Sequence, residues 1–172
     1  MSNNNMSIVD HLEELRWRIL KSLGSILFMS ILTFNFANSL VDILIQPASQ
    51  INSDLNLQVL TIQGMFLLKW NLAIIGGIIL SLPVITVQVW KFLSPGLYDK
   101  EKKILIPLIL TAFICFILGG VFAYKVILPF SLDFFASMIT ADIQNNFSIN
   151  YYFSFVLSLM IGAGLILSLI HI

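Results

Sequence analysis

Four long apolar runs constrain this chain more than any other feature. They cover residues 19–40, 70–92, 104–128 and 151–166, and each approaches or exceeds the roughly 20 residues that cross a bilayer as a helix. Hydrophobic residues make up 58% of the chain and charged residues 10%, against about 45–50% and about 25% in ordinary soluble domains. Lipid satisfies no backbone hydrogen bonds, so the runs must be helical. We therefore expect an all-α polytopic membrane protein with one membrane domain over residues 1–166.

Basic residues are distributed unevenly around these runs. Seven of the nine lysines and arginines lie near the start of the first run or in and beside the connection 93–103. Positively charged segments are retained on the cytoplasmic side of a membrane. The N-terminal segment 1–18 and the loop 93–103 are therefore predicted to be cytoplasmic. The segments 41–69 and 129–150 are predicted to lie on the opposite side, here called the trans side.

Several classes of function find no support in the residues. A net charge of zero argues against nucleic-acid binding, and the single cysteine, Cys115, builds neither a disulfide nor a thiolate metal site. No cleavable signal peptide is visible, because the first residues are polar. An enzyme would need a nucleophile, a base or a metal cluster in the spans, and their residues offer none that is credible. No cofactor is expected. A small-solute transporter or channel subunit stays as the alternative, although no acidic or basic residue lies deep in a span to mark an ion path.

Prolines and glycines inside the runs have structural interpretations. Pro83 and Pro107 remove backbone donors and are expected to kink their helices. The pairs at 76–77 and 119–120 are Gly-Gly, a device that lets membrane helices approach closely. Gln88, late in the second run, is expected to hydrogen-bond to a neighbouring helix, and the three tryptophans lie where interfacial anchoring is expected.

Two charged motifs flank the membrane on the predicted cytoplasmic side. The first, HLEELRWR, covers residues 11–18, and capping-box spacing upstream predicts a helix from Ile8 that places His11, Glu14 and Arg18 on one face. Glu14 and Arg18 then form an i,i+4 pair worth a few tenths of a kcal/mol, and the arginines set topology. The second motif, FLSPGLYDKEKK, covers residues 92–103, and its structural interpretation is a solvated loop whose lysines set topology. Topology explains neither Glu14 nor Glu101, and two carboxylates there suit a cationic ligand from the cytoplasm.

The combination of motifs resembles the TatC family, the multispanning receptor subunit of the twin-arginine protein translocase. The resemblance rests on HLEELRWR, on PVITVQVWKFLSPGLYDKEKK at residues 83–103 and on FAYKVILPF at residues 122–130, with fitting spacing over residues 8–166. It implies a cupped bundle of six helices with a cytoplasmic N-terminus. It also implies recognition of signal peptides with two consecutive arginines, partnership with single-span TatA and TatB subunits, and export of folded proteins driven by the proton-motive force.

The resemblance assigns roles to individual residues. The twin arginines are read by glutamates that match Glu14 and Glu101. Supporting positions in the two motifs are His11, Leu15, Arg16, Phe92, Pro95, Leu97 and Tyr98, and structural positions are Pro47, Pro83, Gln88 and Pro129. Gly96 replaces a frequent alanine without consequence. A homo-oligomeric receptor complex is implied, in a bacterial cytoplasmic (inner) membrane or else a thylakoid or mitochondrial inner membrane.

Simple energetics limits what the two carboxylates contribute. A carboxylate accepts both prongs of an arginine fork, which lysine cannot offer. Two charge-assisted contacts supply roughly 3–6 kcal/mol, short of the roughly 8 kcal/mol of micromolar binding. We therefore expect a second contact surface along the inner faces of the spans, where the apolar part of a signal peptide would pack.

The last six residues, LSLIHI at 167–172, match the translation of a transposase adaptor used in sequencing libraries. The family usually has glutamate or glutamine and then proline in this part of the fourth span. We therefore hypothesise that residues 167–172 are a read-through scar, in which case His171 has no biological role. On this hypothesis the fourth helix is truncated, the fifth and sixth are missing, and the fragment is itself inactive in translocation.

Overall fold

The computed structural model describes residues 8–50, 56–93, 99–138 and 146–171, with side chains described except at 8–10, 56, 93, 99–106 and 171. In chain order the elements are helices α1 (Ile8–Asn35) and α2 (Ala37–Ser49), strand β1 (Asn56–Gln58), helices α3 (Gly64–Leu93) and α4 (Asp99–Phe122), π-helix η2 (Ala123–Ile127), helix α5 (Leu128–Ser137), strand β2 (Asn146–Ser148) and helix α6 (Ile149–His171). Within these described ranges, four helical stretches are long and apolar enough to cross a membrane, at His11–Asn35, Gly64–Phe92, Pro107–Ser137 and Ile149–Ile170. The predicted all-α polytopic membrane protein is confirmed.

The helices extend past several of the predicted span limits. The third stretch continues from α4 through η2 and α5 to Ser137, past residue 128, where the third apolar run was expected to end. The reason is local: LPFSLDFFAS is largely apolar and contains no glycine, and Pro129 sits in the first turn of α5, where a proline is tolerated. The helix α6 likewise continues through residue 166 to His171.

Two short strands are a feature that the sequence did not predict. The strands β1 and β2 pair in parallel, with Leu57 opposite Phe147, and the Gln58 side-chain amide donates to Asn146 Oδ1 at 3.2 Å. Three residues per strand are too few for the alternating pattern by which a strand is recognised. The pairing joins the segment before α3 to the segment before α6.

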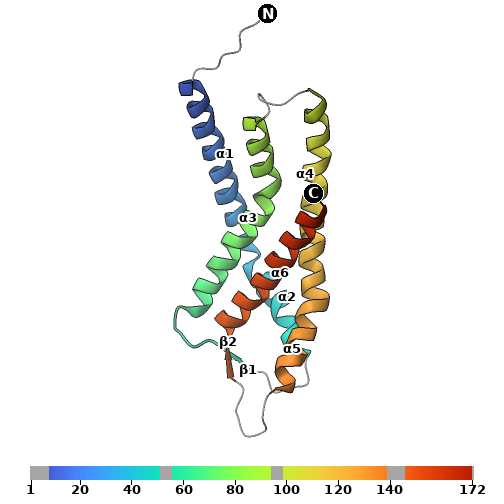
Figure 1. Ribbon diagram of the computed structural model, residues 1–172. Helices are drawn as coiled ribbons and strands as arrows, with labels where there is room; N and C mark the ends of the chain where they lie inside the picture. Colours follow the sequence, from blue (N-terminus) through green and yellow to red (C-terminus); the bar gives the residue numbers. More distant parts are fainter. Residues whose placement is uncertain (1–7, 51–55, 94–98, 139–145, 172) are drawn as a thin grey trace, which may run out of the picture.

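The spanning helices form two close pairs, α1 with α3 and α4 with α6 (Figure 1). In both pairs, a glycine allows the two helices to approach closely. A Cβ atom at Gly77 would lie 2.6 Å from the backbone nitrogen of Ser30, and one at Gly119 would lie 2.6 Å from the carbonyl oxygen of Ala163. Real Cβ atoms do not come so close to backbone, so only glycine permits these crossings. The predicted role of the glycine pairs in helix packing is confirmed.

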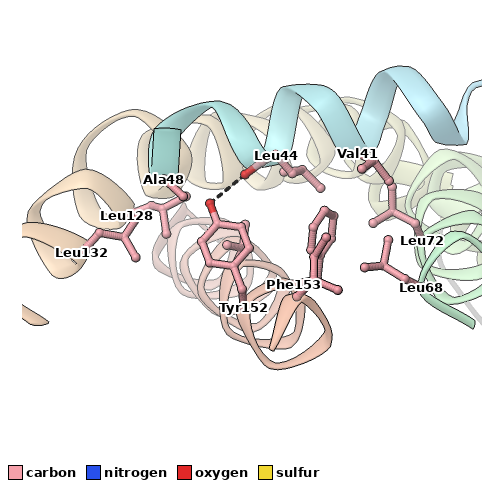
Figure 2. Close-up of a cluster of buried hydrophobic side chains, with 11 residues drawn as sticks. Val41, Leu44, Ala48, Leu68, Leu72, Leu128, Leu132, Tyr152 and Phe153 are labelled. Carbon is pink, nitrogen blue, oxygen red and sulfur yellow. Dashed lines mark hydrogen bonds between the residues drawn. The ribbon is translucent and has the colours of Figure 1, made fainter. Parts of the chain in front are cut away.

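The two pairs meet around α2, at the end of the molecule that the sequence predicts to lie on the trans side. Figure 2 shows side chains of α2, α3, α5 and α6 converging there. The buried cluster consists of Val41, Leu44, Ala48, Leu68, Leu72, Leu128, Leu132, Ile149, Tyr152, Phe153 and Val156. At the other end, α1, α3 and α4 have few contacts across the two pairs. The core therefore holds the two helix pairs together at that end of the molecule.

Two tyrosines from distant segments hold the backbone of α2. Pro47 has no N–H group, so the carbonyl of Ile43, four residues earlier, loses its helical donor. The Tyr124 hydroxyl donates to that carbonyl at 2.6 Å, and the Tyr152 hydroxyl donates to the carbonyl of Leu44 at 2.7 Å (Figure 2 shows the second bond). The proline thus creates an unpaired acceptor that a side chain of η2 satisfies.

Candidate functional site

The first charged motif lies on the N-terminal part of α1, with one stripe turned inward. The side chains of His11, Glu14, Leu15 and Arg18 are half-buried, whereas Glu13, Arg16 and Trp17 are exposed. A spacing of three and four residues places the inward set on one helical face, which packs along α3. The predicted shared face of His11, Glu14 and Arg18 is confirmed. Arg16 lies on a different face from Glu14.

Glu14 is already paired inside the chain. The Arg18 Nε donates to Glu14 Oε1 at 3.0 Å, and Arg18 Nη2 also contacts that oxygen. Of the side chains that the structure describes, only His11 lies near the second oxygen, Oε2, with Nδ1 at 3.9 Å, which is beyond hydrogen-bond distance. The Glu14 side chain is 25% exposed and that of Arg18 19%, so the pair is partly shielded from water and stronger than a surface pair.

An aromatic contact joins the two charged motifs. The imidazole of His11 stacks on the ring of Phe92, at the end of α3, with centroids 4.3 Å apart and an angle of 15° between the planes. The motifs are separated by about eighty residues of sequence, yet their first members touch. The stacking also orients His11 beside the Glu14 carboxylate.

The rest of the second motif follows this contact. Pro95, Leu97 and Tyr98 lie outside the described residues. Glu101 lies in the first turn of α4, and its side chain is likewise outside the described set. Figure 1 shows the start of α4 at the same end of the molecule as the start of α1 and the end of α3. The fold therefore brings the segments that carry Glu14 and Glu101 to one end.

The predicted structural residues occupy separate places. Pro47 is buried in α2, Pro83 lies inside α3, and Gln88 is half-buried one turn before Phe92. Pro129 follows η2, where the missing proline N–H cannot close an α-type bond to the Lys125 carbonyl, in keeping with the wider π turn.

Sequence reasoning missed the partners of α2. No role was predicted for Tyr124 or Tyr152 from the sequence. Pro47 was the only available signal, because a proline in a helix announces a freed carbonyl at Ile43. The sequence contains nothing that says which hydroxyl would reach it from some eighty residues away.

An apolar hollow lies between the two helix pairs. It has a volume of about 240 Å³ and is lined by α3, α4 and α6, with Leu82, Thr86, Ala112, Phe113, Leu165 and Ser168 among its walls. The Ser168 hydroxyl donates to the Ala112 carbonyl at 3.1 Å, but Ser168 belongs to residues 167–172, the hypothesised scar, so the walls outside it are those of α3 and α4 together with Leu165. Apart from the two hydroxyls the walls are hydrocarbon, so the hollow suits an apolar side chain rather than an ion.

Comparison with known proteins gives one consistent result. Residues 10–172 match the family model described as Sec-independent protein translocase protein (TatC). The protein of that name from Aquifex aeolicus is 35% identical over 164 residues, covering 93% of this chain and 68% of the relative. The one from Azotobacter chroococcum is 33% identical, covering 95% of this chain and 64% of the relative.

Solved structures agree with the sequence relatives. A crystal structure of the twin-arginine translocase receptor TatC superposes with a TM-score of 0.76 at 33% identity, covering 90% of this chain and 69% of that one. The chain thus spans about two thirds of the length of the proteins it matches.

Proposed function

The chain belongs to the TatC family, and from this we propose that its protein is the membrane receptor that reads twin-arginine signal peptides for export of folded proteins. The observation that carries the proposal is the half-buried Glu14 carboxylate, held at the end of the molecule to which the fold also brings the Glu101 segment. A carboxylate kept beside the membrane on an inward helical face suits an arginine ligand, whose planar fork matches its two oxygens.

The apolar hollow between α3, α4 and α6 supplies the second part of the binding site. The two carboxylates contribute roughly 3–6 kcal/mol, and micromolar affinity needs roughly 8 kcal/mol. At about 25 cal/mol per Å² the difference of roughly 2–5 kcal/mol corresponds to about 80–200 Å² of buried apolar surface. The hollow between α3, α4 and α6 offers apolar walls next to the motif-bearing end. We place the hydrophobic segment of the signal peptide there.

The site assignment is tested by charge removal with a matched control. Glu14→Ala and Glu101→Ala are expected to abolish binding of a fluorescent twin-arginine signal peptide to the chain in lipid nanodiscs. Glu13→Ala removes a neighbouring carboxylate from the exposed face of the same helix turn and is expected to leave binding unchanged. Unchanged binding in the double variant, with folding verified by circular dichroism, contradicts the assignment.

The position of the apolar segment is tested separately by crosslinking. A photoreactive group in the hydrophobic part of the peptide should label α3, α4 or α6 around Thr86 and Phe113. Labelling confined to the cytoplasmic loops contradicts the placement of the hydrophobic segment in the hollow. It does not contradict the assignment of Glu14 and Glu101 as the arginine-binding residues.

Partners and location follow from the same family membership. We propose that the protein works with TatA and TatB type single-span subunits and assembles with further copies of itself. Large apolar side chains cover much of the outside of the spans, for example Leu27, Ile31 and Leu118, and such faces suit lipid or other helices. We place the protein in a bacterial cytoplasmic membrane with its N-terminus in the cytoplasm, on the charge asymmetry of the segments. Residues 167–172 remain a proposed adaptor scar, which resequencing of the source DNA past codon 166 would test.

A further inference from the structure

We propose that Arg18 is an internal occupant of the signal-binding carboxylate, a stand-in arginine that the signal peptide must displace. The inference rests on the proposed function, because it takes Glu14 as the acceptor of a signal arginine. Its basis is the contact of two Arg18 nitrogens, Nε and Nη2, with a single oxygen of Glu14.

The geometry divides the Glu14 carboxylate into an occupied and an open half. Oε1 carries both contacts from Arg18, and among the described side chains Oε2 has only His11 Nδ1 near it, at 3.9 Å. A bidentate arginine needs both oxygens of the carboxylate. An arriving guanidinium therefore makes a single contact at Oε2 for as long as Arg18 stays, and completes its fork only when Arg18 leaves Oε1.

The empty receptor gains from this arrangement. A partly buried carboxylate without a partner is costly, and Glu14 is 25% exposed. Arg18 lies four residues after Glu14, the favoured order for a helical ion pair, so it satisfies the carboxylate at once when no signal is present. Release requires only a change of side-chain rotamer, because both partners belong to one helix and the α1 backbone stays in place.

The need to displace Arg18 affects a ligand according to whether the ligand contacts one or both oxygens of Glu14. A ligand that uses both oxygens competes with Arg18, whereas a lysine, which makes one point contact, is accommodated at Oε2 without displacing it. Arg18 therefore lowers the affinity for arginine more than that for lysine. Removing a nearby positive charge acts differently, because relief of general repulsion favours both ligands equally.

This difference defines the experiment. The affinities of a synthetic twin-arginine signal peptide and of its lysine-lysine counterpart are measured on the chain in nanodiscs, with Arg18→Gln compared with Lys21→Gln. Lys21 is exposed on the same helix, and its variant loses the same charge. Arg18→Gln should tighten arginine-peptide binding by about three- to tenfold, between the effect of an exposed i,i+4 pair and that of a full charge-assisted contact. The lysine peptide should gain no more than it does in Lys21→Gln.

Further variants separate the possible outcomes. Arg18→Lys keeps the charge and helix propensity but offers no fork, and an intermediate arginine-peptide affinity is expected from it. In a Glu14→Gln background, Arg18→Gln should tighten whatever arginine-peptide binding remains by no more than Lys21→Gln does. If Glu14→Gln alone leaves binding intact, the proposed function fails. Where Glu14→Gln abolishes binding, three results overturn the stand-in role of Arg18. These are that Arg18→Gln lowers the affinity for the arginine peptide, leaves that affinity unchanged, or raises the affinities for both peptides equally.

Discussion

The hydroxyl of Tyr124 is expected to stabilise the fold only because Pro47 is present. Pro47 leaves the Ile43 carbonyl without its backbone donor, and Tyr124 donates to it at 2.6 Å. Tyr124→Phe then leaves an acceptor with neither partner. Hydrogen bonds in membrane proteins contribute about 0.6 kcal/mol on average and at most about 1.7 kcal/mol. We expect Tyr124→Phe to lower the free energy of unfolding by about 0.5–1.5 kcal/mol.

The dependence on Pro47 appears in a double-mutant cycle. Pro47→Ala restores a backbone N–H that can donate to the Ile43 carbonyl, so Tyr124→Phe in that background should cost less than about 0.5 kcal/mol. Tyr152 binds the next carbonyl, Leu44, whose helical donor is the N–H of residue 48, and Pro47 does not remove that donor. Pro47→Ala should therefore couple to Tyr124→Phe and leave the cost of Tyr152→Phe unchanged.

The assay is reversible unfolding in mixed detergent micelles, followed by circular dichroism for each single and double variant. Tyr151→Phe is the matched control: Tyr151 is 80% exposed, and its hydroxyl has no hydrogen-bond partner among the described residues. Additive costs of Pro47→Ala and Tyr124→Phe, within about 0.3 kcal/mol, would refute the explanation of the α2 hydrogen bonds.

Two further predictions concern helix packing and ligand binding. Gly77→Ala should destabilise the fold by more than about 2 kcal/mol, because its Cβ meets the backbone of Ser30, whereas Gly24→Ala, with nothing within 4 Å, should be neutral or stabilising in the same unfolding assay. Raising the salt concentration from about 0.05 to about 0.5 M should weaken twin-arginine peptide binding measured by fluorescence anisotropy, and no change would contradict an electrostatic site.

The sequence allowed prediction of those features that depend on local chemistry. Apolar length gave the spanning helices, and helical periodicity put Glu14 and Arg18 within reach of one another. Helix limits were less predictable, because an apolar helix such as α5 continues past the predicted end of the span when no residue stops it. The contact of His11 with Phe92 and the bond from Tyr124 to Ile43 depend on how whole helices pack together, which no local pattern encodes.

The trans-side core is expected to control the distant carboxylates through helix length. The helix α3 has 30 residues and is therefore about 45 Å long, so a tilt of about 5° at its trans end moves its cytoplasmic end by about 4 Å. Charge-assisted hydrogen bonds are lost over less than that. The helix α2 is packed against both helix pairs through Val41, Leu44 and the two tyrosines.

Loosening α2 should therefore weaken signal-peptide binding without touching the binding residues. The Tyr124→Phe/Tyr152→Phe double variant should bind the twin-arginine peptide several-fold more weakly while the His11 and Phe92 pair within α1 and α3 stays intact, because that pair moves as one unit. A spin label on α1 and another on α4 would report the change in separation of the two pairs. Weaker binding at an unchanged separation would show that the loss arises at the motifs themselves and not from the trans-side core.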